Sequence, residues 1–191
     1  MELHDLIIRN RSYRRFNQNH PVDKDTLIKL IELARLSPSG ANRQPLKFMV
    51  FNSPEDCRKI FPTTLWAAYL KDWDGPLEGE RPSAYVIILG DRTITEGFGV
   101  DHGIAAQSIM LGAAEAGLGG CIIGSIKKDD LRKVIKVSDD YAILLVLALG
   151  KPAEKVVIDS AEGNDIMYWR DDLNVHHVPK RALGEIVLNY K

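Results

Sequence analysis

Ala84-Tyr85-Val86-Ile87-Ile88-Leu89 is a continuous apolar run near the middle of the chain. A strand that is apolar on both faces is typical of the centre of a sheet that is covered on both sides. The stretch 143–149 is a second run of this kind. The two runs therefore predict central strands of a sheet that is flanked by helices.

Shorter patterns on either side of these runs alternate between helix and strand. Asp23 and Ser53 are expected helix caps, and a glycine at position 117 is an expected helix stop. Strands are expected at 47–52 and 121–123, and helices at 2–9, 23–37, 63–73, 97–116, around 131–135 and from Ser53 onward. Many small residues in the 97–116 helix would let another backbone approach closely. This order predicts one α+β domain over 1–155, followed by a polar, irregular C-terminal arm over 156–191 with an amphipathic segment near its end.

The composition excludes several classes of protein. The chain has 191 residues and a formal net charge of −1, so no nucleic-acid partner is expected. No apolar run is long enough to cross a bilayer, so no membrane partner is expected. Cys57 and Cys121 lack metal-ligand spacing and are expected to be buried thiols in a reducing compartment. Because the first residues lack the pattern of a signal peptide, we expect a cytoplasmic protein.

Arg11-Ser12-Tyr13-Arg14-Arg15-Phe16 places a hydroxyl among guanidinium groups. Such a set of donors suits a phosphate dianion. The alternative from composition is a solvated basic face after a helix, which would also include Arg9.

Pro38-Ser39-Gly40-Ala41-Asn42-Arg43-Gln44-Pro45 follows where the 23–37 helix should end. Small and amide side chains leave its backbone able to lie flat against a planar ligand. The alternative is an ordinary turn between a helix and a strand.

The glycine-dense stretch 117–124 is not a dinucleotide fingerprint, because its spacing is wrong and no strand precedes it. A helix stop followed by a short strand is the alternative. The chain also lacks a P-loop, a G-x-S-x-G motif and a Cys/His metal cluster. His176 and His177 have no carboxylate at a telling spacing, so no catalytic or metal role is expected for them.

The arginine segment and the 38–45 segment, in this order, closely resemble the nitroreductase family of FMN-dependent oxidoreductases. In that family a basic residue, a serine and a second basic residue hold the FMN phosphate, and Arg11, Ser12 and Arg14 match them. Asn10 departs from the pattern, since many members have a basic residue there, and Arg9 or Arg15 would compensate. Arg14 could instead stabilise the reduced flavin.

The resemblance assigns the second segment to a dimer. Pro38, Ser39 and Gly40 match residues that reach across the interface to the flavin of the partner. Asn42 matches an amide that hydrogen-bonds around that cofactor.

Two later positions also match the family. Ile123 and Gly124 would present backbone N–H groups to N5 and O4 of the flavin. Lys180 and Arg181 match a basic pair that returns to the phosphate, with a solvated basic loop as the alternative.

The resemblance implies a mixed or antiparallel sheet flanked by helices and an intertwined homodimer, with the arm packed on the partner. It implies ping-pong transfer of hydride from NADH or NADPH, through FMN, to an electron-poor small molecule such as a nitroaromatic or a quinone. The aromatic helix at 63–73 and the loop to Arg81 would cover the flavin and select the acceptor. The alternative is a helix that uses its Trp and Tyr side chains as core. Alternatives are a flavin sensor or store without turnover, and a reduced-flavin enzyme that dehalogenates its substrate or fragments the flavin.

Overall fold

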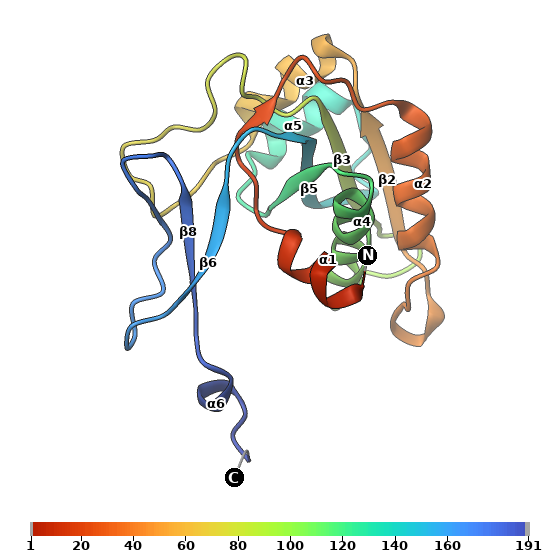
Figure 1. Cartoon of the computed structure of the whole chain (residues 1–191). Helices are drawn as coiled ribbons and strands as arrows, with labels where there is room; N and C mark the ends of the chain where they lie inside the picture. Colours follow the sequence, from red (N-terminus) through yellow and green to blue (C-terminus); the bar gives the residue numbers. More distant parts are fainter. Residues whose placement is uncertain (1, 190–191) are drawn as a thin grey trace. The chain divides into compact units, whose positions relative to one another are not determined.

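The computed structural model describes residues 2–189. Residue 1 of the domain expected over 1–155, and residues 190 and 191 of the arm expected over 156–191, lie outside the described residues. The described residues form two compact units (Figure 1). The first comprises the chain up to Trp66 together with Gly75–Ala153, and the second comprises Ala67–Asp74 together with the residues from Glu154 onward.

The first unit is built on a five-stranded sheet in which all pairings between strands are antiparallel. Its strands are β1 (Phe16–Asn17), β2 (Leu46–Phe51), β3 (Ala84–Asp91), β4 (Gly119–Ile123) and β5 (Tyr141–Pro152). β3 lies between β2 and β5, and both β1 and β4 pair with β5. The four strands expected from sequence are confirmed, and the sheet is antiparallel rather than mixed.

Burial on both faces explains the apolar run in β3. Val86 and Ile88 belong to one core cluster, with residues of α2 (Lys24–Arg35) and α4 (Asp101–Glu115). Ile87 and Leu89 belong to another, with residues of α3 (Pro54–Ile60) and α5 (Lys128–Ile135). Successive side chains of a strand point to opposite faces, so a strand between two helical layers must be apolar throughout.

α4 is the central helix of one layer, and its small residues allow close packing as expected. A Cβ on Gly112 would collide with the side chains of Leu30 and Leu33 on α2. Gly117, at φ +74°, ends the helix: the Leu118 N–H donates to the Ala113 carbonyl at 2.8 Å. The start is later than predicted, at Asp101, because backbone that includes Gly99 at φ +48° precedes it.

Two helices start at the caps expected from sequence. Asp23 accepts from the Thr26 N–H at 2.7 Å at the start of α2, and Ser53 accepts from the Asp56 N–H at 3.1 Å at the start of α3. The first helix, α1, spans Leu3–Arg9 as expected. Both cysteines are buried, and neither forms a disulfide. Among residues 2–189, none of the helices has the length and apolarity to cross a membrane.

The helix expected at 63–73 is wrong. A 3₁₀ turn, η2 (Phe61–Thr63), is followed by a bridge between Thr64 and Ile126, and the Leu65 N–H donates to the Ser125 carbonyl at 3.0 Å. β-Branched Thr64 favours this extended pairing over a helix. Ala67, at φ +43°, then begins a turn in which the Leu70 N–H donates to its carbonyl at 2.8 Å.

The second unit contains a three-stranded sheet, so the prediction of an irregular arm is wrong for most of its length. β8 (His176–Lys180) pairs with β6 (Val156–Ser160) in parallel and with β7 (Trp169–Arg170) in antiparallel orientation. α6 (Leu183–Ile186) lies where the amphipathic segment was expected.

His177 on β8 has two carboxylate partners, which corrects the expectation from spacing. Its Nδ1 lies 2.6 Å from Asp159 Oδ2, its Nε2 lies 3.4 Å from Asp171 Oδ2, and its ring stacks on Trp169 at 4.2 Å. A neutral imidazole has one N–H, so only the imidazolium can donate to both carboxylates. The hydrogen bond to Asp159 is the main cause that raises the pKa of His177, with Asp171 adding to it.

We expect this unit to loosen as the pH rises. Because the pKa of His177 is raised on folding, its stabilising contribution is complete below the unfolded value and is lost as the pH rises through the folded value. Limited proteolysis of the arm should therefore be slower at pH 6 than at pH 9, after correction for the intrinsic rate of the protease. His177→Gln should remove this difference, and an equal pH effect in the variant would contradict the assignment. An NMR titration should place the pKa of His177 above 6.5.

Candidate functional site

The arginine segment lies beside the start of β4. Ser12 forms a parallel bridge with Gly120, and the Tyr13 N–H donates to the Gly120 carbonyl at 2.9 Å. A Cβ on Gly119 would collide with the Tyr13 ring, and one on Gly120 would collide with the Ala148 carbonyl. The glycines of the 117–124 stretch therefore bring two of the predicted motifs together.

The cations of this segment differ in their partners. The Arg14 side chain is buried, with the residue 9% exposed, and its Nη1 donates to the Ser12 carbonyl at 3.3 Å. Half-buried Arg11 donates from Nη2 to the Ile7 carbonyl at 2.6 Å, and its buried Nε has no hydrogen-bond partner within residues 2–189. Arg15 has its Nε 3.4 Å from a carboxylate oxygen of Glu80.

This set of donors fits a phosphate. Arg11 has no carboxylate within ion-pair distance anywhere in the described part of the chain, so its charge is not neutralised by the protein. The exposed Ser12 stands between the two guanidinium-bearing residues. A dianion would receive charge-assisted hydrogen bonds from such a group. Arg15 is the less suitable ligand, because Glu80 already offsets its charge.

The loop around Gly40 is fixed by a residue that sequence reasoning missed. Asp101, at the start of α4, accepts from Ser39 Oγ at 2.6 Å and from the Gly40 N–H at 3.0 Å. Ser39 Oγ also accepts from the Gln44 N–H at 3.0 Å. The hydrogen bond from Ser39 is the main cause that holds the pKa of Asp101 below its usual value. The only sequence signal for this role of Asp101 was that an acidic residue is favoured at the start of a helix.

The same loop has an exposed outer side. Asn42 belongs to a short 3₁₀ turn, η1 (Gly40–Asn42), and both Ala41 and Asn42 have φ near +50°. Pro38 and Ser39 border a cavity of about 340 Å³, whose apolar walls come from α2 and β2. The structure thus joins this loop to α4 and α2, while it joins the arginine segment to β4.

Asp101→Asn is expected to destabilise the protein by about 2 kcal/mol, because the loop would lose a charged acceptor for two hydrogen bonds. The depressed pKa of Asp101 means that this stabilisation is complete above the unfolded value near 4 and is lost as the pH falls through the folded value. Urea unfolding at pH 7 and pH 3.5 should therefore show a smaller difference at the lower pH. Asp129→Asn, at an exposed site on α5, is the control, and equal losses in both variants would contradict the prediction.

Of the remaining residues predicted to bind the cofactor, Ile123 and Gly124 lie in the first unit, and Lys180 and Arg181 lie in the second. The Ile123 side chain is buried in the core, and exposed Gly124 follows it, so only their backbone can face a ligand. Lys180 and Arg181 are exposed and belong to the second unit. Arg181 Nη1 donates to Asn164 Oδ1 at 3.3 Å. The approach of this basic pair to the arginine segment stays a prediction.

Known proteins resemble this chain in sequence and in fold. The sequence profile of the Nitroreductase family matches residues 7–151. A Bacillus subtilis (strain 168) protein named "Putative NAD(P)H nitroreductase YodC" is 25% identical to this chain, and the match covers 77% of this chain and 88% of the relative.

Two solved structures share the fold. A nitroreductase family protein from Clostridium difficile 630 has a TM-score of 0.68 and 21% identity, and covers 100% of this chain and 99% of its own. An FMN-dependent nitroreductase from Clostridium difficile R20291 has a TM-score of 0.65 and 22% identity, and covers 85% of this chain and 92% of its own. With the profile match over residues 7–151, these observations establish that the chain belongs to the nitroreductase family.

Proposed function

We propose that this chain is an FMN-dependent oxidoreductase that uses NADH or NADPH to reduce an electron-poor small molecule such as a nitroaromatic or a quinone. The observation that carries the proposal is the attachment of the Arg11–Arg14 segment to Gly120. In this segment exposed Ser12 directly follows Arg11, which has no carboxylate partner among residues 2–189. Family membership and the names of the relatives, which include NAD(P)H and FMN, support it.

Each part of the site has a task in this proposal. Arg11 and Ser12 hold the phosphate, and buried Arg14 either joins them or stabilises negative charge on the ring. About 13 Å of strand separates Gly120 from Gly124, which is room for an extended ligand along β4. The backbone at Ile123 and Gly124 then faces the ring. A bound FMN supplies the redox chemistry, accepting electrons from the nicotinamide and passing them to the acceptor.

We also propose that the active form is a homodimer. In the first unit, exposed apolar side chains gather on two helices: Leu3, Ile7 and Ile8 on α1, and Ile28 and Leu33 on α2. In the second unit, Leu173 and Leu188 are exposed. Apolar patches of this kind are typical of protein interfaces. In this arrangement Pro38, Ser39 and Gly40 contact the flavin of the partner, the arm packs on the partner, and Lys180 and Arg181 reach a phosphate.

The purified full-length chain tests the proposal. It should be yellow, should release FMN on denaturation, and should oxidise NADH or NADPH with a nitroaromatic or a quinone as acceptor. Light scattering should give the mass of two chains. A colourless protein that FMN does not convert to a coloured form would overturn the cofactor assignment, and FMN binding without turnover would favour a sensor or store.

A further inference from the structure

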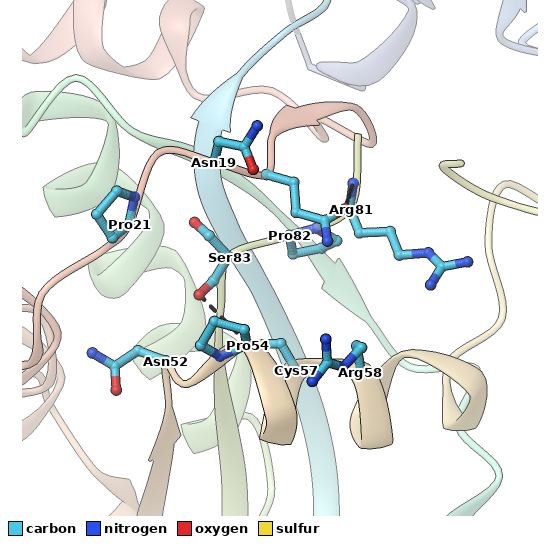
Figure 2. Close-up of a pocket in the computed structure, with 10 residues that line it drawn as sticks. Asn19, Pro21, Asn52, Pro54, Cys57, Arg58, Arg81, Pro82 and Ser83 are labelled. Atoms are coloured by element: carbon cyan, nitrogen blue, oxygen red, sulfur yellow. Dashed lines mark hydrogen bonds between the residues drawn. The ribbon is translucent and has the colours of Figure 1, made fainter. Parts of the chain in front are cut away.

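A second cavity lies in the first unit, and none of the residues expected to hold the flavin lines it. Its volume is about 420 Å³, within the range of small-molecule sites. Figure 2 shows its walls: the loop after β1, the start of α3 and the residues that lead into β3. The lining residues are Gln18, Asn19, Pro21, Asn52, Pro54, Cys57, Arg58, Arg81, Pro82 and Ser83.

The cavity wall carries positive charge without a carboxylate. Arg58 and Arg81 line it, and neither forms an ion pair with any residue in the described range 2–189. The acids nearest in sequence on α3 are engaged elsewhere: Glu55 pairs with Lys59 at 2.6 Å, and Asp56 accepts from Ser53 at 2.6 Å. The cavity therefore favours an anion.

Two buried polar atoms of residues that line this cavity have no hydrogen-bond partner among the residues that the structure describes. They are Arg81 Nε and Ser83 Oγ. Such groups normally find a hydrogen bond, because burying them alone costs free energy. The Arg81 guanidinium is held over the Phe61 ring, 4.3 Å from its centroid. A guanidinium that is held in place in this way, with no carboxylate partner among the described residues, is well suited to bind a carboxylate or phosphate oxygen.

The amide side chains can add further donors. The Gln18 carbonyl oxygen accepts from the Gly79 and Arg81 N–H groups at 2.8 and 3.2 Å, which leaves its NH₂ group for a ligand. Pro21, Pro54 and Pro82 supply apolar wall. Cys57 belongs to the wall and not to a reactive site, because burial raises the pKa of its thiol to about 11.

We propose that this cavity binds a small organic anion through its carboxylate or phosphate group, with Arg58 and Arg81 as the charged ligands and Ser83 as a neutral one. The site is separate from the proposed flavin phosphate site, because none of the residues expected to hold FMN lines it. The proline wall contacts the apolar body of the ligand.

Three probes of similar body test the charge requirement: benzoate, phenyl phosphate and uncharged benzamide. The full-length protein is used with excess FMN, so that the proposed phosphate site at Arg11 is already filled. Side-chain amide NMR signals of Gln18, Asn19 and Asn52 report on the cavity itself. We expect both anions to shift these signals with millimolar or tighter affinity, and benzamide to bind at least tenfold more weakly.

Matched variants distinguish anion binding at this cavity from general attraction of anions to the positive charges of the protein surface. Arg58→Gln, at an exposed position, and Arg81→Gln should each weaken anion binding at least fivefold. Lys59→Gln removes the same charge from the next residue of α3, outside the cavity, and should change binding less than twofold. Absence of shifts, equal binding of benzamide, or equal losses in Arg58→Gln and Lys59→Gln would each overturn the proposal. Failure of FMN binding would leave the amide readout intact, so the two proposals fail separately.

Discussion

Replacing Arg11 by Gln should weaken FMN binding roughly 10- to 150-fold, which corresponds to the 1.5–3 kcal/mol of one charge-assisted hydrogen bond. The effect should be large because Arg11 has no carboxylate partner in residues 2–189, so its charge is available to the phosphate. Titration of the apoprotein with FMN, followed by flavin fluorescence, gives the two dissociation constants.

Riboflavin is the matched ligand for this test, because it lacks the phosphate. The Arg11→Gln variant and the unmodified chain should bind riboflavin equally, within about twofold. Lys133→Gln, which removes an exposed charge on α5, should leave both affinities unchanged. Equal losses for FMN and riboflavin would show that Arg11 supports the fold or the ring and not the phosphate.

The fold was largely predictable because its signals are local. The run in β3 is apolar on both faces, and the two core clusters take its alternate side chains. Asp23, Ser53 and Gly117 act as the caps that their residue types favour. Each of these features depends on residues within one turn or one strand, so sequence alone carries them.

The errors concern features set by distant residues. A helix is expected from sequence at 63–73, but Thr64 at its start pairs with distant Ile126, and no α-helix forms in this segment. Asp101 accepts a hydrogen bond from Ser39, which lies 62 positions earlier in the chain, and thereby fixes the loop around Gly40. Asp159 meets His177 across a parallel strand pair, a contact that spacing along the chain does not reveal.

Sequence alone also identified only some of the residues of the candidate phosphate site. Arg11, Ser12 and Arg14 could be singled out from their residue types, and the bridge to Gly120 gives them a place beside β4. Their neighbour Arg15 could not be ranked from sequence, since Glu80 reaches it from the loop before β3. Because the Arg15 guanidinium lies 3.4 Å from the Glu80 carboxylate, its positive charge is partly offset and its attraction for a phosphate is weaker.

Gly120→Ala should be the most damaging single-methyl change at the site. The added Cβ would collide with the Ala148 carbonyl, and it would also lie 2.8 Å from Leu149 Cδ2 and 3.0 Å from Met110 Cε. A backbone carbonyl within the β4–β5 pairing cannot rotate away, so the strand must shift. We expect a loss of about 3 kcal/mol in the free energy of unfolding, and a fall in melting temperature of roughly 6–12 °C at 2–4 °C per kcal/mol.

Gly124→Ala is the control, four residues further along the same chain segment. Its Cβ would meet only Leu145 Cδ2, at 3.9 Å, which is ordinary contact. Urea and thermal unfolding should therefore separate the two variants clearly. FMN affinity should also fall in Gly120→Ala, because the Tyr13 N–H donates to the Gly120 carbonyl and the arginine segment would move with the strand. Equal stability of the two variants would contradict the close approach of β4 to β5, and with it the attachment on which the phosphate site depends.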